Sequence, residues 1–554
     1  MPSVKQYKTR YERMLSERSN VDVQSQTIAE LFAPSRAQIT RKVEPGSSMT
    51  QKIFDSTAIF ANVILAASLH SFLTNPSTKW ASLKFANEEL NEQPEAREFL
   101  EAAASRLLLG FRQSNFDAAV NESYLNLGAF GIGCQVAEEK DPDETEEEIE
   151  GFRGFRFEAF NPGTYTLAEN AEKRVDTLYH TDQMSVRAAA DRFGENVLSD
   201  EAKAALRKDE DMPLKLLHCV HPRRRQERGK TGTRQHPFAS VWMELETDSK
   251  LLESGYQEFP FQVVRWGKVM GNPYGFGPGH MSLNDVQSKN RARELGFRTW
   301  AKAIDPPMKM LDDGVLSDVD IRASGLTIVQ RMDAIQPWES TTPLNMQLDQ
   351  FNHMELKTSI REMFFTDLLL ALMSRDAPAM TATEVVAKQQ ILMRLLGPTF
   401  GRLISELFNP LIDRAFGLML RAGALPELPE IVRVAAAQGQ GDIEVEYEGP
   451  LARAQKQDDS MLIVQGIQTA VGLFGENAAD VIKMDEAQKR MLEASGFPAD
   501  LVRTDKEIAE RREERVAAMQ AEKQLDDLEQ AARTAAEASK AQPLMDMVAQ
   551  GEAA

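Results

Sequence analysis

The chain has 554 residues, 42% hydrophobic and 27% charged, with a formal net charge of -20 and an isoelectric point near 5.0. This length predicts several domains, because single hydrophobic cores stop growing beyond about 250–300 residues. The acidic balance argues against a simple binder of duplex DNA, which is usually basic, but it is compatible with DNA that slides past without sticking.

The sequence also narrows the cellular setting. Only two cysteines occur, Cys134 and Cys219, which excludes a disulfide scaffold or a cysteine-rich zinc module and suits a reducing cytoplasm. No apolar run approaches the roughly 18 residues of a membrane-spanning helix. The N-terminal residues lack the apolar stretch of a secretory signal. We therefore expect no membrane association.

The first 140 residues predict mainly helices. Apolar residues recur there at three- and four-residue spacing, as on the buried face of a helix. The predicted helices cover residues 4–33, 54–73, 94–111 and 116–127. Trp80, Leu83 and Phe85 alternate with polar residues and predict a half-buried strand, and the glycines of GAFGIG at 128–133 introduce another.

Residues 138–160 predict a hairpin. An acidic run, EEKDPDETEEEIE, separates two strand-like pieces, of which the second is FRGFRFEAF. A solvated tip is the favoured interpretation; the alternative is a cluster of metal-binding carboxylates, but their spacing matches no EF-hand loop. A short helical pair follows at 184–208, and two more strands then flank a basic loop at 223–236.

A zinc site is suggested by His218, Cys219, His221 and His236. An alternative function is a hydrolase that uses His218, His221 and His236. His218 and His221 are three residues apart on a predicted strand, so their side chains point to opposite faces. A structural role is therefore favoured. The sequence GKTG at 229–232 is no phosphate-binding loop, because the leading glycine and the following helix are missing.

Two helices of similar length bracket a small insertion. Glycines and prolines at 271–279 predict an irregular approach, after which a helix covers 282–304. A second helix covers 344–366, and 306–343 between them predicts a compact α/β insertion. The first helix is basic: it carries Lys289, Arg291, Arg293, Arg298 and Lys302 against Asp285 and Glu294. The pattern predicts an antiparallel helix pair with a subdomain at its tip.

The longest apolar stripe lies C-terminal to this pair. A short apolar piece and a polar loop at 367–380 precede a helix over 381–423, whose start, Thr381-Ala-Thr-Glu384, fits a capping box. Gly397-Pro398 predicts a bend in its middle, and Pro410 is a candidate for a second one. Beyond a strand within 441–452 the chain predicts helix again, and 503–554 predicts an exposed charged tail.

The order of these landmarks resembles that of portal proteins, the head-to-tail connectors of short-tailed bacteriophages. The matching motifs, which cover residues 1–460, are NPSTKW at 75–80, SNF at 114–116, GAFGIG at 128–133, NPYGFGPG at 272–279, TATEV at 381–385, LFNPLIDR at 407–414, GALPELP at 423–429 and YEGPLARAQ at 447–455. The expected fold class is α+β, predominantly α-helical.

The resemblance implies a ring, typically of twelve copies, with a central channel at one vertex of the capsid. The implied divisions are a wing at 1–280, stem helices at 281–305 and 344–366, a clip at 306–343, a tunnel loop at 367–380, a long kinked helix and wing at 381–445, a crown at 446–502 and a tail at 503–554. Double-stranded DNA would pass through the channel during packaging and ejection.

The resemblance also implies site residues and partners. The expected channel residues are Lys289, Arg293, Lys302, Ser374, Arg375 and Asp376. The expected partner-binding residues of the clip are Asp312, Asp313, Asp318 and Trp338. The expected partners are further copies of the chain, the terminase packaging motor, tail adaptor proteins, and the major capsid and scaffolding proteins. No enzymatic activity, metal or cofactor is expected; a helical scaffold or adaptor unrelated to DNA is the remaining alternative.

Overall fold

The computed structural model divides the chain into two compact units. It describes residues 3–140 except 42, 43 and 45, residues 151–304 except 225–227 and 229–231, and residues 308–311, 333–337, 346–373, 391, 394–438 and 442–447, with short stretches inside 319–331 and beyond 462. Unit 1 consists of Met1–Lys84, Phe99–Leu428 and Ile443–Gln455, and unit 2 of Phe85–Glu98, Pro429–Asp442 and Lys456–Ala554. All side chains discussed below belong to unit 1.

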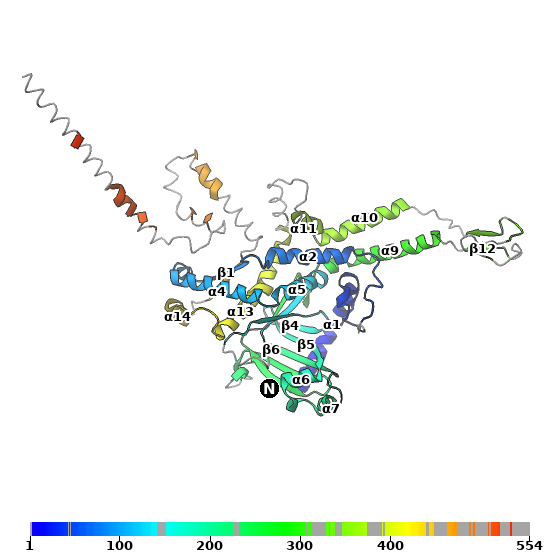
Figure 1. Ribbon diagram of the computed structural model, residues 1–554, viewed down its shortest axis with the longest axis horizontal. Helices are drawn as coiled ribbons and strands as arrows, with labels where there is room; N and C mark the ends of the chain where they lie inside the picture. The colour runs from blue at the N-terminus through cyan, green and yellow to red at the C-terminus, as the bar shows by residue number, and fades with distance from the viewer. Residues whose placement is uncertain are drawn as a thin grey trace, which may run out of the picture. The chain divides into compact units, whose positions relative to one another are not determined.

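A five-stranded antiparallel sheet forms one part of unit 1 (Figure 1). Its strands follow one another in chain order: β4 (Tyr165–Glu169), β5 (Val175–Ser185), β6 (Pro213–Pro222), β7 (Phe238–Glu244) and β8 (Lys250–Tyr256). Helix α1 (Val4–Phe32) covers one face, and α6 (Val186–Phe193) and α7 (Asp200–Lys208) cover the other. The predicted helical pair and the predicted strands around the basic loop are thereby confirmed.

Side-chain alternation on β6 explains why both faces are covered. Leu217 and Cys219 pack with Tyr7 and Met14 of α1, whereas Leu216 packs with the apolar residues of α6 and α7. Neighbouring residues on a strand point to opposite faces, so a strand that is buried at consecutive positions needs a layer on each side. Residues 216–221 of β6 are all buried and have that pattern.

A second, three-stranded sheet lies next to the helical part of unit 1. Its order is β3 (Phe155–Ala159), β2 (Ile132–Glu139) and β9 (Phe261–Arg265), and both pairs are antiparallel. The predicted hairpin of β2 and β3 is confirmed, although its acidic tip at 141–150 lies outside the described residues. Phe111 and Phe116 stack on each other, and both meet Phe157 of this sheet edge to face.

The helices of the first 140 residues agree with the predicted ones. They are α1, α2 (Thr57–Leu73), the short α3 (Glu88–Asn91), α4 (Pro94–Arg112) and α5 (Phe116–Phe130). α2 packs along α5, which leads directly into β2. The predicted strand at Trp80–Phe85 is β1 (Ala81–Phe85), and it pairs with β14 (Ile443–Tyr447) from the far end of the chain.

The glycine- and proline-rich stretch at 271–279 is more regular than predicted. β11 (Asn272–Phe276) pairs with β10 (Gly267–Val269), and α8 (Pro278–Met281) adds one helical turn. The glycines supply a turn at Gly271, whose φ is +76°, and close backbone contacts elsewhere.

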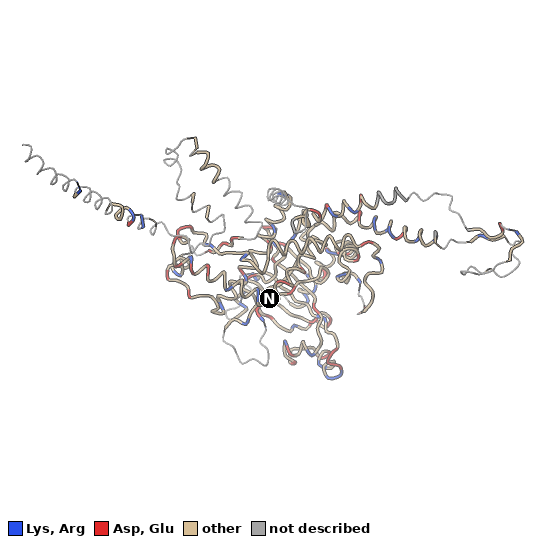
Figure 2. Tube along the Cα trace, turned by 45° about the horizontal axis from the view of Figure 1, so that its top comes forward, with Lys and Arg blue, Asp and Glu red and all other residues tan. Residues whose placement is uncertain are grey.

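The predicted antiparallel helix pair is present. α9 (Leu283–Ile304) and α10 (Met346–Met363) run side by side (Figures 1 and 2), and the Ser359 hydroxyl donates to an Asp285 carboxylate oxygen over 2.7 Å. The described part of the insertion between them holds a two-stranded pair, β12 (Met308–Met310) and β13 (Ile335–Pro337), at the far end of the two helices.

The described part of the long apolar helix contains an irregularity that the sequence did not predict. Its predicted start, including the capping box at 381–384, lies outside the described residues. Residues 394–402 stay helical through Gly397-Pro398, and the irregularity is a π-helix at Leu403–Phe408, just before α13 (Asn409–Arg421). Pro410 explains the position, because a proline ring clashes with the carbonyl group four residues earlier and a π-turn widens the helix there. Gly423, with φ at +68°, ends the helix as predicted.

Two further α-helices lie in the described part of the chain. α11 (Thr366–Met373) forms the short apolar piece that follows α10, and α14 (Glu430–Ala437) belongs to unit 2. Among the described residues, no helix is both long and apolar enough to cross a membrane.

Candidate functional site

The base of α9 is anchored to the segment that precedes α2. The Lys289 ammonium lies 3.1 Å from an Asp55 carboxylate oxygen and donates to the Thr57 hydroxyl over 2.6 Å. The Asn290 side chain accepts from the Phe54 amide and donates to the Lys52 carbonyl oxygen. Lys289 is only 3% exposed, and burial lowers its pKa although Asp55 opposes the shift. A lysine held in this way is poorly suited to contact DNA.

The other two predicted channel residues of α9 lie on opposite sides of the helix. Arg293 and Lys302 are nine residues apart, which is about two and a half turns at 3.6 residues per turn. They cannot line one surface together. Arg293 places its guanidinium 5.1 Å from the centre of the Phe297 ring.

Lys302 shares its side of α9 with two arginines. Arg291 and Arg298 both pair with Glu294, over 2.6 Å and 2.5 Å, and both lie within one helical face of Lys302 because they are eleven and four residues away. We call Arg291, Arg298 and Lys302 the basic face of α9. One carboxylate for three cations leaves this face positive.

The remaining predicted site residues cannot be placed. Ser374, Arg375 and Asp376, and the clip residues Asp312, Asp313, Asp318 and Trp338, lie outside the described residues. Their roles stay predictions.

Arg265 and Trp266, at the end of β9, contact the residues on either side of the segment 366–402. The guanidinium of Arg265, 2% exposed, pairs with Glu169 and, over 2.6 Å, with Glu406 in the π-helix; Glu406 also accepts from the Arg265 amide over 2.9 Å. The next residue, Trp266, stacks on Phe365.

Phe365 joins α10 to α11 in an unusual conformation. Its φ is +55°, a left-handed value that is rare and strained for a bulky residue. Strain of this kind persists only where the surroundings enforce it. The Arg265–Trp266 pair therefore fixes the two irregular points between which the predicted tunnel loop lies.

The two glycine motifs of the chain meet backbone to backbone. Gly131, with φ at +67°, would place a β-carbon 2.5 Å from the Gly277 amide nitrogen, and Gly277 would place one 2.7 Å from the Gly131 α-carbon. Gly279 lies against the Ala129 carbonyl group in the same way. This contact joins α5 and β2 to the turn that starts α9.

The histidines that suggested zinc do not converge. His218 lies between His180, at 3.1 Å, and the Ser240 hydroxyl, at 2.8 Å, and it stacks on Trp242. His221 lies on the opposite face beside Tyr7, as the strand periodicity predicted. His236 hydrogen-bonds to the Gly255 carbonyl oxygen. Within the described parts of the chain, no group of three or more His, Cys, Asp or Glu residues could hold a metal ion.

The buried pair His180 and His218 predicts acid sensitivity of the five-stranded sheet. Burial lowers the pKa of His180 to about 4 and that of His218 well below its usual value. The unfolded chain then binds more protons than the folded one below a pH of about 6.5, so stability is lost as the pH falls from 6.5 towards 4. For His180 alone the loss approaches roughly 3 kcal/mol.

Urea denaturation at successive pH values tests this prediction, with His180→Gln as the variant. The variant is expected to lose much of the pH dependence between 6.5 and 4. An unchanged slope would contradict the assignment.

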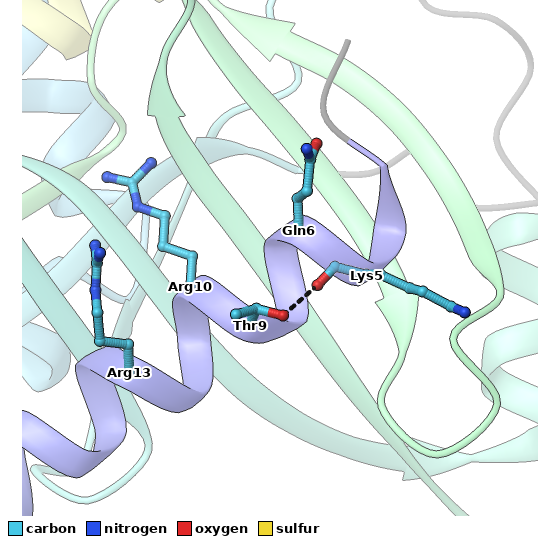
Figure 3. Close-up of a pocket in the computed structure, with 5 residues that line it drawn as sticks. All are labelled: Lys5, Gln6, Thr9, Arg10 and Arg13. Carbon is cyan, nitrogen blue, oxygen red and sulfur yellow. Dashed lines mark hydrogen bonds between the residues drawn. The ribbon is translucent and has the colours of Figure 1, made fainter.

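A shallow basic hollow of about 380 Å³ lies along the N-terminal half of α1, lined by Lys5, Gln6, Thr9, Arg10 and Arg13 (Figure 3). The Arg10 guanidinium already lies 5.4 Å from the centre of the Tyr179 ring and donates to Thr177 over 3.4 Å. One of the positive charges that line the hollow, that of Arg10, is therefore already in contact with other residues of the chain.

Comparison with known proteins decides the family. The model of the family described as bacteriophage head to tail connecting protein matches residues 4–502. The chain belongs to this family. A head-to-tail connector, or portal, is a structural protein of the virion located at the portal vertex of the capsid, so the predicted function, location and lack of enzymatic activity agree with the family.

Two curated relatives match nearly the whole connector. The portal protein of Salmonella phage epsilon15 is 26% identical over 523 residues, which cover 92% of this chain and 90% of that protein. The probable portal protein of Bordetella phage BPP-1 is 26% identical over 504 residues, covering 89% and 87%.

Solved structures of gene transfer agent particles are also similar in part. A chain of the native virion covers 79% of the connector and 94% of its own length, with 10% identity and a TM-score of 0.33. A chain of the neck of the empty particle covers 77% and 91%, with 12% identity and a TM-score of 0.35.

Sequence reasoning missed several of the connector's structural residues. Nothing in the local pattern pairs Arg265 with Glu406, because the two are 141 residues apart. The π-helix had one usable signal, Pro410, which was interpreted only as a bend. The basic face of α9 could have been separated from Arg293 by helical phase.

Proposed function

We propose that copies of this connector, about twelve of them, close into a ring whose channel conducts double-stranded DNA during packaging and ejection. The observation that carries the proposal is the α9–α10 pair. It is fixed at one end to the segment before α2 through Lys289 and Asp55 and bears the basic face of Arg291, Arg298 and Lys302.

The charge distribution supports a channel that does not hold DNA tightly. Each copy carries a formal net charge of -20, so a ring of copies is an acidic tube that repels duplex DNA, whose charges lie about 1.7 Å apart. The basic face of each copy includes one carboxylate, so its cations bind phosphates weakly. As the DNA moves, each cation can exchange one phosphate for the next. Lys302 is the predicted channel residue that suits this role best; Ser374, Arg375 and Asp376 remain proposed for the narrowest part.

The ends of the proposed channel have different partners. We assign residues 306–343, with Asp312, Asp313, Asp318 and Trp338, to the docking of the terminase and later of tail adaptor proteins. Residues 446–502 face the capsid interior, with scaffolding and major capsid proteins nearby. The order of the motifs in the sequence supports a phage with a short tail.

Electron microscopy of the purified full-length protein, with and without scaffolding protein, tests the ring. Rings of about twelve copies with a central hole are expected. Persistent failure to form rings in both conditions would contradict the proposal.

A packaging assay tests the basic face. Arg291→Gln, Arg298→Gln and Lys302→Gln together are expected to leave ring assembly intact and to change packaging efficiency or DNA retention several-fold. The matched control neutralises the exposed Arg187, Arg207 and Lys208 on α6 and α7 and is expected to package normally. Normal packaging by the first variant would remove the role assigned to the basic face.

A further inference from the structure

One side of α9, apolar at four of six positions, continues beyond the part that the chain itself covers. Val286, Lys289, Arg293, Phe297, Trp300 and Ile304 recur at three- and four-residue spacing. Val286 and Lys289 are buried, at 4% and 3% exposure. Further along the same side, Phe297, Trp300 and Ile304 are 44%, 48% and 85% exposed. We call Arg293, Phe297, Trp300 and Ile304 the α9 ridge.

The exposed ridge has the composition of an interface. Aromatic side chains bury large areas and, with arginine, dominate the energy of protein interfaces. Phe297 and Trp300 meet edge to face, and Arg293 lies over Phe297, so these side chains already contact one another within a single chain. Within one chain it is left open to solvent, which costs free energy unless another surface covers it.

The outward side of α10 is complementary. Met354 is 71% exposed, and Glu355 and Glu362 are exposed one heptad apart, so they lie on one side of the helix. Neither glutamate forms an ion pair with a residue that the structure describes. We call Met354, Glu355, Thr358 and Glu362 the α10 outer face; it lies away from the buried Ile360 and Phe364.

We propose that the α9 ridge of one copy packs against the α10 outer face of the next copy. Phe297 and Trp300 cover Met354, and Arg293 pairs with Glu355 or Glu362. The two surfaces differ, so each copy offers one of each and the contact is heterologous, the type that repeats into a closed ring. This inference rests on the proposed ring and identifies which sides of the helix pair form its seam.

The seam also separates two kinds of basic residue on α9. Arg293 belongs to the contact between copies, whereas Arg291, Arg298 and Lys302 lie around the helix from it and stay free to face the channel. Arg293, buried in the proposed seam, therefore does not contact DNA.

Single variants test the ridge. Trp300→Ala is expected to raise the concentration needed for half-maximal ring formation at least tenfold, measured by sedimentation velocity. Leu295→Ala is the matched control: Leu295 is an equally exposed apolar residue, at 46%, on a different side of α9. Equal ring formation by both variants would overturn the proposal.

Charge exchange tests the pairing. Arg293→Glu alone, and Glu355→Arg with Glu362→Arg, are each expected to weaken ring formation. The combination of all three changes is expected to restore it. These residues are exposed, so circular dichroism and the thermal midpoint of the single chain are expected to stay unchanged. Failure of the combination to restore assembly would contradict the assigned pairing.

Cross-linking gives a direct readout. Trp300→Cys combined with Met354→Cys is expected to link copies into a ladder under mild oxidation, while Leu295→Cys with Met354→Cys gives none. The native Cys134 and Cys219 are buried and do not compete. Rings without cross-links would refute the seam but leave the ring standing; unmodified protein that forms no ring would refute both.

Discussion

Replacing Gly279 or Gly277 with alanine is expected to destabilise unit 1 by at least about 3 kcal/mol and to lower the yield of folded protein sharply. The added methyl group of Gly279→Ala would press on the Ala129 carbonyl group, 2.8 Å from its carbon atom, and that of Gly277→Ala would lie 2.7 Å from the Gly131 α-carbon. Each neighbour is backbone, not the flexible end of a side chain, so relief requires α5 to separate from the turn that starts α9.

Urea denaturation followed by tryptophan fluorescence measures the effect. Gly296→Ala provides the control, because Gly296 is helical and has nothing within 4 Å of the added methyl group. It is expected to be neutral or to stabilise by about 0.5–1 kcal/mol, since glycine weakens a helix interior by that amount. Similar transitions for Gly279→Ala and Gly296→Ala would show that the glycine contact is not close packed.

Removing the charge of Arg265 is expected to cost roughly 3–5 kcal/mol. Arg265→Met keeps much of the length of the side chain but leaves Glu169 and Glu406 without the buried guanidinium. Lys268, 3.0 Å from Glu169, compensates only one of the two carboxylates. Of its contacts with residue 265, Glu406 in the π-helix at Leu403–Phe408 keeps only the hydrogen bond from the main-chain amide, so faster hydrogen exchange is expected there and in α13.

Two comparisons interpret this result. Adding Glu406→Gln to Arg265→Met is expected to recover part of the lost stability, because one uncompensated charge disappears. The control Arg298→Met removes an exposed arginine whose partner is Glu294 and is expected to cost less than about 1 kcal/mol. If Arg265→Met costs no more than this control, the buried pair does not hold the π-helix in place.

Local sequence pattern determined most of the secondary structure. Helical spacing of apolar residues located α1, α2, α4 and α5, alternation located β1, and similar lengths around an insertion predicted the antiparallel α9 and α10. These features depend on residues a few positions apart, for which periodicity is direct evidence. The ordered motifs went further and indicated the family, which the match over residues 4–502 bears out.

The tertiary structure alone decided which partner each side chain meets. From the sequence, Lys289 was expected to be free to contact DNA. In the structure it forms an ion pair with Asp55, in a segment more than 200 residues earlier. The Gly131 and Gly277 motifs were recognised separately in the sequence. Only the fold shows that their backbones contact each other. Contacts between distant segments leave no trace in local spacing, because folding and not periodicity brings them together.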